Sequence, residues 1–157
     1  MRSTSYLAEQ RVAFDPIAHA PAFCASRRAS WLRTPGREVA KAVLLAGPDG
    51  LFLAVLRATH EVALDELSGL WSGTVRLASA EESARVFRDC EWGAASAFGN
   101  LYGLPTILDA GLDAGDRIVF EVGSHFAGVR LTCRDFERLT GALRLDFTRP
   151  LPRRASP

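Results

Sequence analysis

Two apolar runs on either side of the turn sequence Gly47-Pro48-Asp49-Gly50 place the strongest constraint on how this chain can fold. Residues 39–46 precede the turn and residues 51–56 follow it, and both runs consist mainly of apolar residues. The pattern predicts a β-hairpin whose loop is formed by the Gly-Pro-Asp-Gly turn. Because both strands are apolar on both faces, we expect them in the middle of a sheet that is covered on its two sides.

Lys41 interrupts the first of these runs and is the only lysine among 19 lysine and arginine residues. Side-chain alternation places Lys41 on the same face as Val39, Val43 and Leu45. Its ammonium group must therefore reach an edge of the sheet or stand in a pocket. A charged residue that protects an edge strand from pairing is the alternative. The bias toward arginine is typical of a high-GC genome. A retained lysine either marks a position that needs a compact ammonium group or is there by chance.

Apolar spacing, caps and breakers predict the remaining elements. Helices are expected over residues 1–11, 26–33, 62–71, 79–87 and 134–139, and short strands over residues 12–14, 74–77, 106–108, 117–122, 127–132 and 143–147. Ser79 and Glu82 form a capping box at the start of one helix. Thr132 or Cys133 caps the last helix, which Gly141 ends. Helices mixed with strands and hairpin-type connections indicate an α+β (mixed α/β) fold.

Length and composition indicate one globular domain, which we place at residues 1–148, followed by a disordered tail at residues 149–157. The net charge of +1 argues against a broad surface for duplex DNA, and no apolar run approaches the roughly 20 residues that cross a bilayer. The N-terminal segment lacks the apolar core of a signal peptide. The cysteines, Cys24, Cys90 and Cys133, are widely spaced, which fits reduced thiols in the cytoplasm rather than disulfides or a zinc site.

The stretch from Trp92 to Leu108 contains no charged residue and includes Gly93, Gly99 and Gly103. Glycines allow positive φ and let a backbone come close to a ligand. An uncharged loop in a globular protein suggests a partly buried wall, whose backbone N–H groups need partners. We therefore expect a pocket loop here, with a tightly packed connection between a helix and a strand as the alternative.

Familiar catalytic motifs are absent or incomplete in this sequence. The segment that begins at His60 has Leu64 where a zinc-binding HExxH helix needs its second histidine, and the chain has no G-x-G-x-x-G or Walker A loop. His60 and His125 each follow a predicted strand end beside a small hydroxyl residue, and strand ends are where sites gather in sheet proteins. Both histidines are therefore candidate site residues, with a hydrogen-bonded structural role as the alternative.

Three separated segments together resemble the YbaK-type aminoacyl-tRNA deacylases. They are VAKAVLLAGPDGLFLAVLRATHEVALDEL, CEWGAASAFGNLYGLPTILDAGL and VFEVGSHFAGVRLTCRDFERLTG. The same domain occurs as the editing insertion of bacterial prolyl-tRNA synthetases, and the similarity spans residues 14–141. The resemblance implies a curved, largely antiparallel sheet surrounded by helices. It also implies hydrolysis of the ester that joins a wrong amino acid to the tRNA 3′ end.

The resemblance also implies roles for particular residues. Lys41 takes the place of the family's essential lysine, and His125 matches a histidine of close relatives. Gly93 to Ala97 corresponds to the family's G-x-x-x-P loop, with Ala97 in place of the proline. The residues implied in catalysis are Lys41, Gly93, Gly99 and His125. The residues implied in substrate binding are His60, Ala95, Ser96, Ala97, Phe98, Asn100, Asp109, Gly123 and Ser124.

The expected chemistry is ester hydrolysis through a tetrahedral oxyanion. Backbone N–H groups between Gly93 and Gly99 would stabilise the oxyanion, and Lys41 would position the substrate by its charge rather than act as a base. No metal or other cofactor is expected. The implied partners are the 3′ acceptor end of aminoacyl-tRNA and an aminoacyl-tRNA synthetase, with neither a membrane nor duplex DNA. The alternative is a non-catalytic relative that binds aminoacyl-tRNA or aminoacyl-adenylate-like ligands, and Ala97 is its main support.

Overall fold

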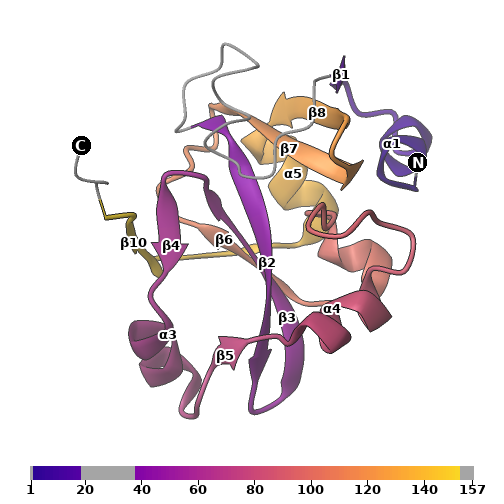
Figure 1. Cartoon of the computed structure of the whole chain (residues 1–157). Helices are drawn as coiled ribbons and strands as arrows, with labels where there is room; N and C mark the ends of the chain where they lie inside the picture. The colour runs from indigo at the N-terminus through magenta and orange to yellow at the C-terminus, as the bar shows by residue number, and fades with distance from the viewer. Residues whose placement is uncertain (1, 19–37, 153–157) are drawn as a thin grey trace, which may run out of the picture.

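The computed structural model of the chain describes residues 2–18 and 38–152 (Figure 1). The predicted helix at residues 26–33 lies outside them, as do His19 and Cys24. The helices are α1 (Arg2–Glu9), α3 (Leu64–Trp71), α4 (Ala80–Val86) and α5 (Cys133–Thr140), together with the 3₁₀ helix η2 (Gly99–Tyr102). The strands are β1 (Asp15–Ala18), β2 (Ala40–Gly47), β3 (Gly50–Arg57), β4 (His60–Val62), β5 (Arg76–Leu77), β6 (Thr106–Asp109), β7 (Arg117–Ser124), β8 (Ala127–Thr132), β9 (Leu143–Leu145) and β10 (Thr148–Pro150).

The β2–β3 hairpin forms the centre of a sheet with the strand order β5-β2-β3-β6-β9. The hairpin forms as predicted, with an antiparallel register that runs from Ala40 opposite Arg57 to Gly47 opposite Gly50. Its loop is shorter than expected, because Gly47 and Gly50 belong to the strands and only Pro48 and Asp49 form the turn. β6 is parallel to both of its neighbours, β3 and β9. The predicted central position of the hairpin is confirmed, because each of its strands has a neighbour on both sides and most of its side chains are at least half-buried.

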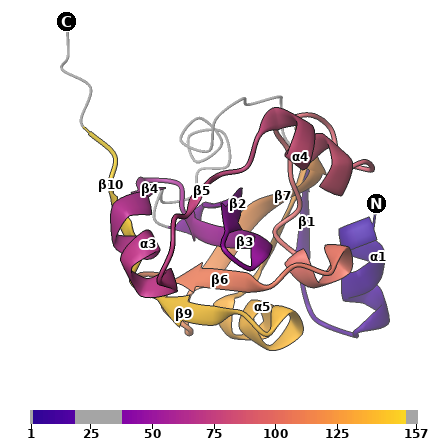
Figure 2. The same cartoon turned by 90° about the horizontal axis from the view of Figure 1, so that it is seen from below.

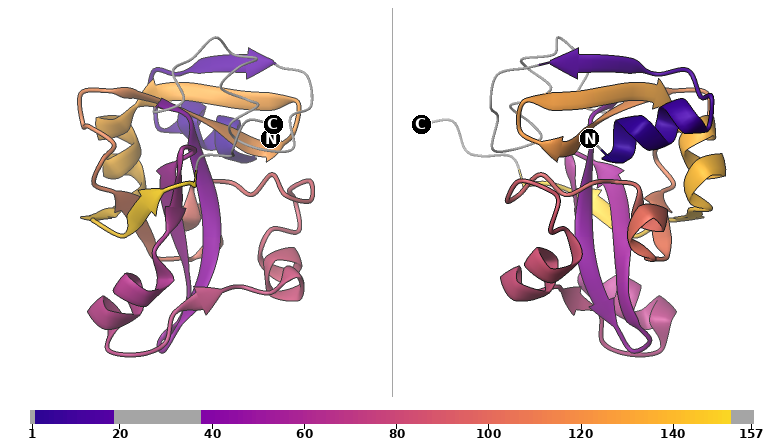
Figure 3. Two further views of the ribbon diagram at one scale, coloured as in Figure 1. Left: turned by 60° about the vertical axis from the view of Figure 1, so that its left-hand side comes forward. Right: turned by 90° about the vertical axis from the view of Figure 1, so that its right-hand side faces the viewer.

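A second, antiparallel sheet with the order β1-β8-β7 lies across one end of the hairpin (Figure 3). The two sheets meet at a parallel bridge between Val39, which directly precedes β2, and Val119 of β7. Further along, β7 carries a register shift between Glu121 and Ser124, which is typical of a β-bulge. β2 and β7 therefore start side by side and then belong to different sheets, which creates a seam between them.

Apolar cores lie on both faces of the five-stranded sheet. The core toward the second sheet contains Phe98, Phe120 and Phe136, whose ring centroids lie 5.4–5.5 Å apart. The other core contains Leu67 of α3 and Phe147. In Figure 2, α3 lies on one side of the hairpin and α1 and α4 lie on the other. These layers confirm the predicted α+β fold.

The structure corrects the predicted strand at residues 12–14. The strand lies instead at Asp15–Ala18 and includes Pro16. The physical reason is that β1 is an edge strand, paired with β8 alone. At such an edge the missing N–H of a proline faces away from the ladder and removes no sheet hydrogen bond.

A second correction concerns two segments that pair with each other. β4 and β10 form a small antiparallel ladder in which His60 lies opposite Pro150 and Val62 lies opposite Thr148. The helix predicted from residue 62 therefore begins at Leu64. The strand includes the first two residues of the predicted tail, and Arg149 forms an ion pair with Glu61 at 3.0 Å. Residues 153–157 lie outside the described residues.

Both predicted helix caps are confirmed. The Ser79 hydroxyl accepts from the backbone N–H of Glu82, and the Glu82 carboxylate accepts from the backbone N–H of Ser79. At α5 the cap is Thr132 and not Cys133, because the Thr132 hydroxyl accepts from the N–H of Asp135. Gly141, with φ of 66°, ends that helix as predicted.

Candidate functional site at the seam of the two sheets

A small cavity opens at the seam where β2 and β7 separate. Lys41 and Glu121 each lie two residues beyond the bridged pair Val39 and Val119, so the parallel bridge brings two charged residues to the same place. The cavity has a volume of about 40 Å³, close to the space of one water molecule. We call it the seam cavity. Its lining residues are Ala40, Lys41, Ala42, Gly93, Ala95, Ala97, Phe120 and Glu121.

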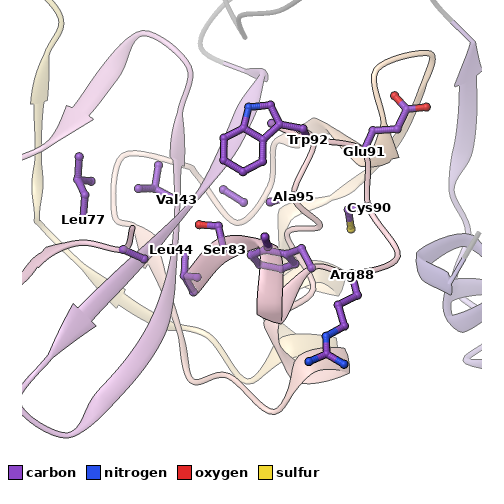
Figure 4. A pocket seen from close by; sticks show the side chains of 14 residues that line it. Val43, Leu44, Leu77, Ser83, Arg88, Cys90, Glu91, Trp92 and Ala95 are labelled. Atoms are coloured by element: carbon purple, nitrogen blue, oxygen red, sulfur yellow. The ribbon is translucent and has the colours of Figure 1, made fainter. Parts of the chain in front are cut away.

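A larger cavity of about 510 Å³, here called the outer cavity, shares the wall residues Ala42, Gly93 and Ala95 with the seam cavity. Its walls come from β2, the end of β5, α4 and the loop that follows α4 (Figure 4). Most of the lining is apolar. Its lining residues are Ala42, Val43, Leu44, Leu77, Ala78, Ser83, Ala84, Phe87, Arg88, Cys90, Glu91, Trp92, Gly93 and Ala95.

The rim of the outer cavity is apolar and exposed. The side chains of Trp92 and Leu77 are 69% and 55% exposed, and they stand on different sides of the cavity in Figure 4. The carboxylate of Glu91 points away from the cavity in the same view. An aromatic side chain at the mouth of an apolar cavity offers a surface on which a nucleic-acid base can stack.

The loop that joins the two cavities approaches the turn between β7 and β8 very closely. Gly93 has φ of 78°, and a Cβ atom there would lie 3.5 Å from Cε1 of His125. Gly123 has φ of 96°, and a Cβ atom there would lie 3.3 Å from Sγ of Cys90. A side chain at either position would therefore be strained, and glycine is what lets the loop and the turn pack together.

His125 connects this turn to the loop. Its Nε2 lies 2.5 Å from the carbonyl oxygen of Trp92. Because a carbonyl oxygen only accepts, Nε2 carries a hydrogen and donates it. On the other side of the ring, Nδ1 lies 3.6 Å from Oε1 of Glu121, which is buried at the seam. His125 is thus in contact with residues of both the loop and the seam.

Four predicted site residues of the loop line neither cavity and contact α1 or the buried core instead. The Ser96 hydroxyl lies 2.9 Å from that of Ser3 in α1, and Asn100 donates to the hydroxyl of Tyr6 at 3.0 Å. Phe98 is part of the buried aromatic cluster. A Cβ atom at Gly99 would lie 2.3 Å from Oγ1 of Thr106, so Gly99 permits a close backbone approach inside the protein.

Asp109 and His60 line neither cavity. Asp109 is buried and accepts from Nε of Arg57 at 2.8 Å and from the N–H of Gly111 at 2.9 Å. Burial favours a higher pKa for this carboxyl, but the hydrogen bonds from Arg57 and Gly111 outweigh it and the pKa is lowered. His60 contacts the Thr59 hydroxyl at 2.8 Å. Its pKa is lowered by burial and by the charges of Arg57 and Lys41, against the opposing charge of Asp109.

Sequence reasoning missed Glu91 and Glu121. Glu121 is 5% exposed and interrupts an apolar strand, which is the same signal that singled out Lys41. Glu91 has no such signal, because it follows Cys90 in an irregular segment and its partners lie more than 30 residues further along the chain. The helix wall of the outer cavity, with Ser83 and Arg88, was also not predicted.

A comparison with known protein families shows which family this chain belongs to. Residues 19–139 match the aminoacyl-tRNA editing domain family. The chain belongs to this family. The resemblance that the three sequence segments carry is therefore confirmed. A search of curated proteins finds no match.

Several solved structures share the fold of this chain. A proposed trans-editing enzyme for prolyl-tRNA synthetase is 21% identical, with 94% of this chain and 96% of that chain covered and a TM-score of 0.82. A crystal structure of a hypothetical protein is 16% identical, with coverage of 95% and 100% and a TM-score of 0.85. A proposed signal-transduction protein from Marinobacter aquaeolei VT8 is 22% identical and covers 86% of this chain but 27% of its own, with a TM-score of 0.68.

Two further observations concern the described residues as a whole. None of their helices is both long enough and apolar enough to cross a membrane. Within residues 2–18 and 38–152 there is also no group of three or more His, Cys, Asp or Glu side chains arranged to hold a metal ion.

Proposed function

We propose that this editing-domain protein is a trans-editing hydrolase that deacylates mischarged aminoacyl-tRNA at its 3′ end. The observation that carries the proposal is the position of Lys41, which shares the seam cavity with Gly93, Ala95 and Ala97 of the glycine-rich loop. An ammonium group and a loop of backbone N–H groups that line one cavity are suited to a reaction that develops negative charge on an oxygen.

The two cavities suggest how the substrate lies. The outer cavity has the volume and the apolar walls that a terminal adenosine requires, and Trp92 stands at its mouth. The seam cavity, at about 40 Å³, has room for a small group such as a short amino-acid side chain or one water molecule. The ester would then lie beside the shared wall of Ala42, Gly93 and Ala95. Ala97 would limit the size of the amino acid that fits.

In this mechanism a water molecule adds to the ester carbonyl carbon, and the bond to the ribose oxygen breaks. The products are the free amino acid and the hydroxyl group at the tRNA 3′ end. Backbone N–H groups of the loop stabilise the tetrahedral oxyanion, and Lys41 positions the ester by its charge. The ribose hydroxyl of the substrate and the loop orient the water. Such an enzyme would act in the cytoplasm beside the synthetase that charges the tRNA.

A deacylation screen tests the proposal. Purified protein would be incubated with proline tRNA charged with alanine, cysteine, serine or threonine, and with correctly charged prolyl-tRNA as the control. We expect hydrolysis of one or a few mischarged species and survival of the control. Binding without turnover on any substrate would contradict the hydrolase and support the non-catalytic alternative, in which Ala97 replaces the proline of an active loop.

A further inference from the structure

Three hydrogen bonds join Glu91 to the β7–β8 turn. Its Oε2 accepts from the backbone N–H of His125 at 2.9 Å, and its Oε1 accepts from the hydroxyl of Ser124 at 3.3 Å. Its own N–H donates to the carbonyl oxygen of Gly123 at 2.8 Å. One residue of the loop is thus bonded to three consecutive residues of the turn.

The turn is also bonded to the loop through one of its own side chains. His125 donates from Nε2 to the carbonyl oxygen of Trp92, the residue that follows Glu91. The imidazole ring lies against Gly93, next in the chain, where a Cβ atom would be 3.5 Å from it. The contacts in both directions form a clamp, which we define as Glu91 and His125.

The clamp sets the start of the segment that faces Lys41. Gly93 is the first loop residue in the seam cavity, and Ala94 donates from its N–H to the carbonyl oxygen of Glu91 at 3.0 Å. At its other end the segment is held by Ser96 and Phe98 in the core. The backbone N–H groups of residues 93–97 therefore lie between two anchored ends.

We propose that Glu91 is a positioning residue, which acts through His125 to hold the glycine-rich loop at the correct distance from Lys41. The proposal rests on the proposed deacylase function for its kinetic consequence. The proposal also makes His125 a positioning residue, because its Nε2–H donates to the carbonyl oxygen of Trp92. Hydrogen-bond geometry of an active-site loop affects the transition state more than the ground state, and a small displacement costs about 10²-fold in rate.

The test compares Glu91→Ala and Glu91→Gln with the control Glu81→Ala, an exposed glutamate of α4 that pairs with Arg85. On the best substrate of the screen we expect kcat of Glu91→Ala to fall about 10²-fold with KM nearly unchanged. Glu91→Gln keeps one acceptor oxygen and should fall less, and Glu81→Ala should match the wild type. A wild-type kcat in Glu91→Ala would overturn the proposal.

A second readout needs no substrate. Long-range ¹H–¹⁵N correlation spectra report which imidazole nitrogen carries a hydrogen, and a His125→Asn variant identifies the signals of His125. We expect Glu91→Ala to shift these signals and to weaken the Nε2–H bond, whereas Glu81→Ala leaves them in place. Unchanged His125 signals would overturn the clamp even if kcat of Glu91→Ala falls. If the wild type deacylates no substrate, the proposed function fails and these spectra alone decide the clamp. If Glu91→Ala does not fold, Glu91→Gln replaces it in both measurements.

Discussion

At the scale of single residues, Lys41 is the most direct test of the site. Replacement by alanine removes the ammonium group from the seam cavity, and we expect kcat/KM for deacylation to fall by about 10²–10³-fold, or about 2.7–4 kcal/mol. The thermal midpoint should stay near that of the wild type. Lys41→Arg keeps the charge but introduces a larger, planar group, so it should also remain slow. Full activity of Lys41→Ala would remove Lys41 from the mechanism.

Ala97 tests whether the departure from the family loop matters. The residue is buried, and within the described part of the chain no hydrogen bond uses its backbone N–H. A proline at this position removes no observed bond and restricts φ. We expect Ala97→Pro to fold and to change either the deacylation rate or the amino-acid preference. An unchanged profile over the panel of charged tRNAs would show that the position is neutral.

Two glycines allow a matched comparison of stability. A Cβ atom at Gly99 would lie 2.3 Å from Oγ1 of Thr106, whereas a Cβ atom at Gly69 in α3 would meet no atom within 4 Å. We expect Gly99→Ala to lower the free energy of unfolding by about 1–3 kcal/mol, and Gly69→Ala to raise it by up to about 1 kcal/mol. Urea denaturation measures both. Adding Thr106→Ala to Gly99→Ala should recover part of the loss. Equal effects at the two positions would contradict the close approach.

At the scale of elements, the sequence predicts what local chemistry determines. The hairpin follows from its turn residues and the α4 cap follows from Ser79 and Glu82, so both were predicted correctly. β4 and β10 were missed because each has three residues and they pair across a long stretch of chain. The pocket loop was predicted from its uncharged composition. The clamp by Glu91 was not, because it depends on a turn that lies elsewhere in the sequence.

The cap of α4 gives a prediction at this scale, because α4 forms a wall of the outer cavity. Hydrogen bonds from Arg76 and then from the Ser79 backbone lower the pKa of Glu82 to about 2. Because this pKa is lower in the folded state, ionised Glu82 stabilises the folded state at pH values above its ordinary pKa of 4.5. This contribution disappears as the pH falls toward 2. We expect Ser79→Ala to lower the free energy of unfolding by about 1 kcal/mol at neutral pH, measured by urea denaturation. Ser5→Ala, at an exposed position of α1, is the control and should change little.

At the scale of the whole molecule, the site lies where two sheets join and then separate. The apolar pattern predicts each strand, yet the bridge between Val39 and Val119 joins strands that are distant in the sequence. The presence of both Lys41 and Glu121 at one cavity therefore depends on tertiary structure. The sequence also does not show that Asp109 pairs with Arg57, because the two residues are far apart in the chain. The family resemblance implies substrate binding for Asp109, whereas the structure shows it in an ion pair with Arg57.

Asp109 also ties the molecule together, because its carboxylate contacts Arg57 of β3 and the hydroxyl of Thr148 in β10. Its side chain is 1% exposed, so removing its charge leaves the partly buried Arg57 unpaired. We expect Asp109→Asn to lower the free energy of unfolding by about 3 kcal/mol and to leave kcat of the folded protein nearly unchanged.

The pKa of Asp109 is lowered from 3.8, so the contribution of its charge to stability is present above that pH and is lost as the pH falls through the folded-state value. Unfolding measured between neutral and acid pH should therefore show a weaker pH dependence in Asp109→Asn than in the wild type. Wild-type stability with lost activity would instead support a role of Asp109 in binding the substrate.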